Sequence, residues 1–150
     1  MQHICRKYSG STFIIHIDAF EQRKFSGRFC FPDQEKICIF ENLMQLLFQM
    51  EQCLDAANEP QAFTAMRSFL AKGRESEYQK EYMLSSAGKL ASFSVQIMFR
   101  RNASWQGTVT WMEEGEKRNF RSVLELLFLI NNALSSKESV VFSGIHCKET

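Results

Sequence analysis

The sequence has few of the residues that interrupt regular secondary structure. It contains 7 Gly and 2 Pro in 150 residues. Long disordered or low-complexity segments usually carry many more of both, so the composition argues against them. Because 45% of the residues are hydrophobic and 14 are Phe, the chain has enough apolar material for a sizeable core. We therefore expect one globular domain over residues 1–150.

The sequence also lacks an excess of one charge and a long apolar run. Lys and Arg number 18 against 17 Asp and Glu, which gives a net charge of +1. The chain as a whole has no strong basic field to attract nucleic acid or an anionic membrane. The apolar run at 126–130 is too short to span a bilayer, and the first ten residues do not resemble a signal peptide. We expect a cytoplasmic protein that does not enter membranes.

No motif for catalysis, metal binding or nucleotide binding is present. The five cysteines are scattered and never spaced Cys-x-x-Cys, so reduced thiols are expected. His3 and Cys5 near one end and His146 and Cys147 near the other have zinc-ligand chemistry, but their spacing matches no zinc finger. His16 is expected on the exposed polar face of a strand. The sequence thus predicts no catalytic residue, no metal and no cofactor, and it favours a protein that is not an enzyme.

The clearest feature present is an internal repeat. Residues 13–54 and 93–134 align without a gap at a shift of eighty positions. We infer repeat one at about 11–57, a connecting segment at 58–90, and repeat two at about 91–136 with a C-terminal tail. The identical pairs are Phe13/Phe93, Ile17/Ile97, Gly27/Gly107, Phe40/Phe120, Leu46/Leu126, Leu47/Leu127, Phe48/Phe128 and Leu54/Leu134.

Each repeat predicts three strands. In repeat two, apolar and polar residues alternate over 93–99 and again over 105–111, which is typical of half-buried strands. Turns are expected at 101–104 and at 113–116, where Gly115 can adopt a positive φ. A short third strand follows at 117–120. The alternation places Trp105 and Trp111 in the core.

A helix follows the third strand in each repeat. Ser122 and Glu125 form a capping box, and Asn42 and Gln45 can serve the same purpose in repeat one. The apolar side of each predicted helix is wider than one sheet requires. We therefore expect each helix to touch a second surface. The residues that widen these apolar sides are Met44, Phe48, Leu124 and Phe128.

These elements predict an α+β fold. We expect two tandem βββα repeats packed with pseudo-twofold symmetry, because a unit of this size is too small to be stable alone. The repeats would share one antiparallel sheet with both helices on one face. Two interpretations remain for the secondary structure of residues 60–70. Phe63, Met66 and Phe69 have helical spacing, whereas the equivalent stretch after repeat two, at 140–144, predicts a strand.

Two segments of repeat two resemble a recurrent pattern in short hypothetical proteins of anaerobic gut Firmicutes. The resemblance covers about one third of the chain, and repeat one departs from it. It implies a bacterial source and supplies no function. The segments are Trp105-Gln106-Gly107-Thr108-Val109-Thr110-Trp111 and Asn119-Phe120-Arg121-Ser122-Val123-Leu124-Glu125-Leu126-Leu127.

The surplus apolar surface leads to a first functional hypothesis. Ile37–Phe40 is apolar on both faces, whereas its counterpart at 117–120 is charged. An apolar strand of this kind is either covered on both sides or is an edge open to pairing. We expect a non-enzymatic interaction or structural module that forms a homodimer or binds another protein. The predicted interface residues are Ile37, Ile39, Met44, Phe48, Leu124 and Phe128.

Two alternatives come from other classes. One is a nucleic-acid-binding domain that uses basic strand ends of repeat two, at Arg100, Arg101, Lys117, Arg118 and Arg121. The other is a small-ligand binder or enzyme with its site between the repeats.

Overall fold

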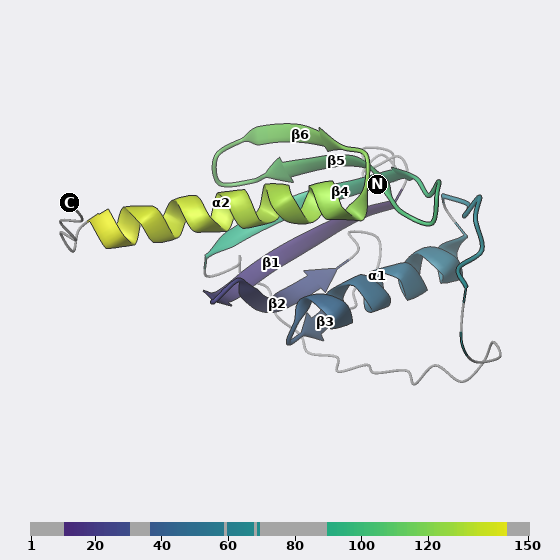
Figure 1. Ribbon diagram of the computed structural model, residues 1–150, viewed down its shortest axis with the longest axis horizontal. Coiled ribbons are helices and arrows are strands. Elements are labelled where there is room, and N and C mark those ends of the chain that lie inside the picture. The colour runs from purple at the N-terminus through teal and green to yellow at the C-terminus, as the bar shows by residue number, and fades with distance from the viewer. Residues whose placement is uncertain (1–10, 31–36, 59, 68, 70–89, 144–150) are drawn as a thin grey trace, which may run out of the picture.

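The computed structural model describes residues 11–30, 37–58, 60–67, 69 and 90–143 (Figure 1). Six strands and two helices form in the order βββαβββα. The α+β class predicted from the sequence is therefore confirmed. The elements are β1 (Ser11–Glu21), β2 (Lys24–Cys30), β3 (Ile37–Phe40), α1 (Leu43–Ala57), β4 (Ala91–Phe99), β5 (Gln106–Trp111), β6 (Glu116–Phe120) and α2 (Val123–Ser143).

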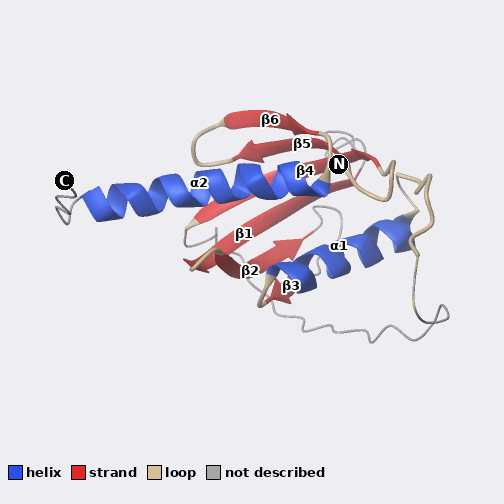
Figure 2. Ribbon diagram, viewed as in Figure 1, coloured by secondary structure: helices blue, strands red, loops and turns tan. Residues whose placement is uncertain are grey.

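The strands form one antiparallel sheet in the order β3-β2-β1-β4-β5-β6. The central strands β1 and β4 pair along their length, so the sheet is continuous between the N-terminal half (residues 11–57) and the C-terminal half (residues 91–143). Both helices lie across the same face of the sheet and run in opposite directions (Figure 2). One antiparallel six-stranded sheet with two helices, as predicted, is confirmed.

The core lies between the sheet and the inner sides of the helices. In β1, Phe13, Ile15 and Ile17 are at most 1% exposed. They alternate with Ile14 and His16, which point to the other face of the sheet and are only partly buried. The inner side of α1 contributes Leu46, Met50 and Leu54, and that of α2 contributes Leu126, Ile130 and Leu134. Trp105 is buried and Trp111 packs against the core, as the alternation predicts.

Strand pairing explains why glycine occupies positions 27 and 107. Gly27 faces Ile17 and Gly107 faces Ile97, each next to a bulge in the longer strand. A Cβ atom at position 27 would collide with the backbone oxygen of His16, and one at position 107 would collide with that of Gln96. Only glycine permits this close approach of two backbones.

Both helices begin with the predicted caps. The Asn42 side chain accepts a hydrogen bond from the backbone N–H of Gln45, whose own side chain accepts from the N–H of Glu41, at 2.9 and 2.8 Å. At α2, Ser122 accepts from the N–H of Glu125 at 3.1 Å, and the Glu125 carboxylate accepts from the N–H of Arg121 at 3.0 Å. Each returning side chain therefore binds the residue before the cap rather than the cap itself. The cap side chains thus satisfy one open donor of each helix start, the N–H of Gln45 or Glu125, and the returning side chains satisfy the N–H of the residue before each cap.

Two sequence-based predictions fail near the ends of the repeats. The strand predicted at 140–144 is wrong over its described residues, because α2 continues to Ser143. No Gly or Pro interrupts the sequence between Val123 and Ser143, so nothing stops the helix earlier. The described part of 60–69 forms neither a helix nor a strand. Its one regular contact is a bridge between Ala62 and Arg100.

Replacing Gly107 by Ala is expected to destabilise the protein by about 2 kcal/mol or more, because the backbone of β4 must move to admit the methyl group. Urea unfolding followed by circular dichroism measures this change. The matched control is Gly115→Asn. Gly115 has a φ of 64° and no atoms near its missing Cβ, and Asn tolerates that conformation. Equal losses in the two variants would contradict this account of Gly107.

Candidate functional site

Among the helix residues whose side chains the structure describes, the most exposed large apolar ones are the four that the sequence assigned to an interface. Met44 and Phe48 of α1 are 65% and 63% exposed, and Leu124 and Phe128 of α2 are 62% and 61% exposed. Each pair is four residues apart, so its members are neighbours on one side of a helix. The opposite side of each helix is buried against the sheet. These four residues, named here the outer stripes, therefore point away from the core.

The other two predicted interface residues lie elsewhere. Ile37 and Ile39 are in β3, whose described partner is β2 and which forms an edge of the sheet. Phe40 is in the core, so alternation turns Ile37 and Ile39 toward the face opposite the helices. Both are only partly buried. The structure thus brings Met44, Phe48, Leu124 and Phe128 onto the helix layer and separates them from Ile37 and Ile39 by the thickness of the sheet.

Arg100 lies inside the protein and is 3% exposed. Its guanidinium donates hydrogen bonds to the carboxylates of Glu51 and Asp55 at 2.8 and 2.7 Å, and to the backbone oxygen of Pro60 at 2.7 Å. The Trp105 indole N–H donates to the second oxygen of Glu51 at 2.5 Å. This arginine cluster joins the end of β4 to the last turns of α1. Arg100 therefore does not present its charge at the surface.

The remaining basic residues of the nucleic-acid hypothesis lie at the surface, but two of them pair with carboxylates. Arg118 contacts Glu116 at 3.0 Å, and Arg121 contacts Glu125 at 2.8 Å. The guanidinium of Arg101 lies 4.6 Å above the Phe99 ring and 5.5 Å from the Phe63 ring. Lys117 is exposed on β6. This arrangement does not concentrate positive charge on one face, as binding to phosphates requires.

A polar cluster occupies the sheet face opposite the helices. The His16 Nδ1 atom lies 3.0 Å from the Ser92 hydroxyl, and the Ser92 backbone N–H donates to Glu113 at 2.6 Å. Arg28 pairs with Asp18 at 3.1 Å. His16 lies on the polar face of β1, as predicted, but it is only partly exposed, because β4 runs alongside β1 and brings Ser92 against the ring. Ser92 is 2% exposed, so a substrate cannot reach its hydroxyl.

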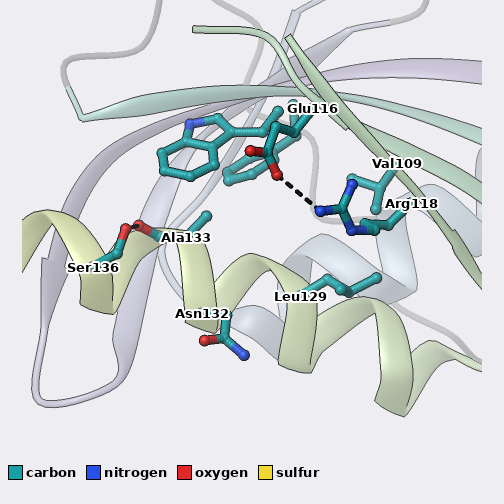
Figure 3. A pocket seen from close by; sticks show the side chains of 9 residues that line it. Val109, Glu116, Arg118, Leu129, Asn132, Ala133 and Ser136 are labelled. Carbon is teal, nitrogen blue, oxygen red and sulfur yellow. Dashed lines mark hydrogen bonds and ion pairs between the residues drawn. The ribbon is translucent and has the colours of Figure 1, made fainter. Parts of the chain in front are cut away.

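A cavity of about 380 Å³ lies between α2 and strands β5 and β6 (Figure 3). Its apolar wall is formed by Phe93, Val109, Trp111, Leu129 and Ala133. Its polar lining residues are Glu116, Arg118, Asn132 and Ser136. Figure 3 shows Glu116 and Arg118 across from α2, and the Asn132 amide pointing away from them. It lies entirely within the C-terminal half. The sequence placed a ligand site between the two repeats, where this cavity does not lie.

Two further findings concern metals and membranes. Within the described residues, no group of three or more His, Cys, Asp or Glu side chains could hold a metal ion. The two terminal His-Cys pairs lie outside those residues. No described helix combines the length and the apolar character needed to cross a membrane.

Comparison with known proteins does not assign the chain to a family. No protein-family model, curated protein or solved structure matches this chain. The resemblance of segments 105–111 and 119–127 to gut Firmicutes proteins stays a prediction.

Sequence reasoning missed the arginine cluster and the cavity. Comparing positions eighty apart would have pointed to both. Arg100 corresponds to Phe20 and Glu51 to Asn131, so the charge pair that links the end of β4 to α1 has no counterpart at positions 20 and 131. Two charges that appear together at core-facing positions indicate a buried pair, because a lone buried charge is costly.

Replacing Arg100 by Phe, the residue at position 20, is expected to destabilise the protein by about 3 kcal/mol, because Glu51 is left partly buried without its cation. The triple variant R100F/E51N/D55S gives this cluster the residues found at positions 20, 131 and 135. This triple variant should recover a large part of the stability that R100F loses. Urea unfolding of both variants measures the difference. A triple variant no more stable than R100F would contradict the proposed pairing.

The environment of His16 predicts a pH dependence of stability. Burial lowers the pKa of His16 below its ordinary value of 6.5, and the positive charge of Arg28 lowers it further against the smaller opposing effects of Asp18 and Glu113. The unfolded chain therefore binds a proton more readily, and stability falls as the pH drops below about 6.5. Replacing His16 by Gln, the residue at position 96, should reduce the change of the unfolding free energy with pH between about pH 7.5 and 5. An unchanged slope would contradict this role.

Proposed function

We propose that this protein is a non-enzymatic interaction module that associates with a second copy of itself through the outer stripes of α1 and α2. The observation that carries the proposal is that Met44, Phe48, Leu124 and Phe128 are each more than 60% exposed. The inner sides of both helices already pack against the core, so the fold does not need the outer stripes to bury it. Clustered exposed apolar residues of this size are typical of protein interaction surfaces.

The expected strength of this association follows from the exposed area. Burying the remaining surface of one such side chain contributes about 1–2 kcal/mol, so four contribute roughly 4–8 kcal/mol per copy. Association itself costs an estimated 4–15 kcal/mol in lost motion. The balance favours a reversible dimer at micromolar concentration rather than a permanent one.

Three features favour a second copy as the partner. The outer stripes are apolar, and an apolar surface is complementary to itself, whereas a charged one repels its own copy. The two helices run in opposite directions across one face (Figure 1), which suits the twofold interface of a symmetric dimer. The net charge is only +1, so two copies repel each other weakly.

We also infer that the chain arose by duplication of a βββα unit and that its halves are related by a pseudo-twofold axis. Strand registers support this inference. Ile17 pairs with Gly27 and Gly27 with Phe40, and each of these pairs recurs eighty positions later. The bulges after Ile17 and Ile97 are also eighty positions apart. We place the module in the cytoplasm of a bacterium, and the absence of disulfides among Cys30, Cys38 and Cys53 is consistent with this.

The outer stripes predict a change of mass on substitution. Light scattering of the native chain should show a mass that rises toward that of a dimer across the micromolar range. The double variant F48E/F128E should remain a monomer, because it places a carboxylate in each apolar stripe. Met112→Glu is the matched control, since Met112 is 48% exposed but lies outside the helices, and it should dimerise normally.

A native chain that stays monomeric at all concentrations would contradict self-association. A double variant that still dimerises would instead place the interface away from the outer stripes, with Ile37 and Ile39 as the next residues to substitute.

A further inference from the structure

The cavity beneath α2 has the wall of an aromatic binding site. The Phe93 and Trp111 rings are nearly parallel, with centroids 6.5 Å apart and planes inclined by 28°. Phe93 is 2% exposed and is held by the core, whereas Trp111 is only partly buried. Flat aromatic molecules bind well beside such surfaces, because they replace water over a large area and stack on the rings.

The N-terminal half carries larger side chains at two of the positions that line this cavity. Val109 corresponds to Phe29, which is 1% exposed and contacts the Phe13 ring at a centroid distance of 5.8 Å. Ala133 corresponds to Cys53, which also packs against the core. Both positions therefore carry a smaller side chain in the C-terminal half. The cavity is opened by side-chain size on a backbone whose strand pairing is the same in both halves.

The groups around the opening restrict the charge of a ligand. Glu116 and Arg118 pair with each other at 3.0 Å, and Arg118 also donates to the backbone oxygen of Lys117 at 2.9 Å. On α2, Ser136 lies on the side nearer Glu116, whereas the Asn132 amide points away from Glu116 (Figure 3). The Ser136 hydroxyl donates to the oxygen of Ala133 at 2.8 Å, which leaves its oxygen able to accept. The opening therefore offers neutral donors and acceptors rather than an unbalanced charge.

We infer that this cavity binds a flat aromatic molecule that carries an uncharged hydrogen-bonding group, such as a hydroxyl or an amide. The aromatic part lies against Trp111 and Phe93, and its polar edge reaches the Ser136 oxygen. A volume of about 380 Å³ lies in the range of small-molecule sites. This site is independent of the outer stripes, since none of its lining residues belongs to them.

Titration with 2-naphthol tests this inference. The two tryptophans give two indole N–H signals in a nitrogen-15 NMR spectrum, and Trp111→Phe identifies the one from the cavity. The Trp111 signal should shift in a saturable manner, whereas the Trp105 signal should not, because Trp105 is bonded to Glu51 outside the cavity. 2-Naphthoate and 2-naphthylmethylammonium should bind more weakly, because each brings a charge to a neutral opening.

Filling the cavity with the residues of the other half provides the decisive variants. Val109→Phe should weaken binding by about tenfold or more, since even one misplaced methylene in an apolar pocket has effects of that order. Ala133→Cys is a smaller change for use if Val109→Phe does not fold, and it should also weaken binding. F48E/F128E should bind 2-naphthol unchanged, whatever its oligomeric state.

Three results would overturn the inference. Equal shifts of both tryptophan signals would indicate non-specific binding, and binding unaffected by Val109→Phe or Ala133→Cys would place the ligand elsewhere. Tighter binding of either charged analogue would refute the neutral polar edge.

Discussion

The pairing of β1 with β4 is the constraint on which the rest of this structure depends. It runs from Ser11 opposite Ile97 to Ile17 opposite Ala91, and the N–H of Leu90 extends it by donating to the oxygen of Ile17 at 2.9 Å. Either set of three strands alone would leave one of these long strands as an open edge, with unpaired backbone groups and half of its core missing. Joining them produces one sheet whose core face is fully covered by two helices. The arginine cluster strengthens the same junction, because it ties α1 to the end of β4.

Once that junction is made, the two halves differ in what they leave available. In the N-terminal half, α1 is held at its C-terminal end by Arg100, and Phe29 fills the space under the helix layer. In the C-terminal half, Asn131 and Ser135 stand where Glu51 and Asp55 would be, and Val109 leaves a cavity. The outer stripes are common to both halves, whereas the cavity described above is lined by the C-terminal half alone. A shared feature suits a symmetric contact between copies, and an unshared one suits a ligand, which needs only one site.

Features set by nearby residues could be predicted from the sequence. Alternation revealed the strands, the caps at Asn42 and Ser122 revealed the helix starts, and the outward position of Met44, Phe48, Leu124 and Phe128 followed from helical spacing. The features that were missed depend on residues far apart in the chain. Arg100 was assigned to the surface because its partner Glu51 lies 49 positions away. His16 was assigned to an exposed face because Ser92, 76 positions away, cannot be placed beside it without the order of the strands. The cavity is lined by residues of four elements, β4, β5, β6 and α2, so no local pattern marks it.

The central claim is that the outer stripes of two copies meet, and intermolecular NOE measurement tests it most directly. A sample that mixes protein labelled with carbon-13 at its methionine methyl groups with unlabelled protein detects contacts between copies alone. The account predicts intermolecular cross-peaks at the methyl group of Met44, to aromatic or leucine protons of the second copy, and none at Met112. A dimer that shows these cross-peaks at Met112 and none at Met44 would contradict it.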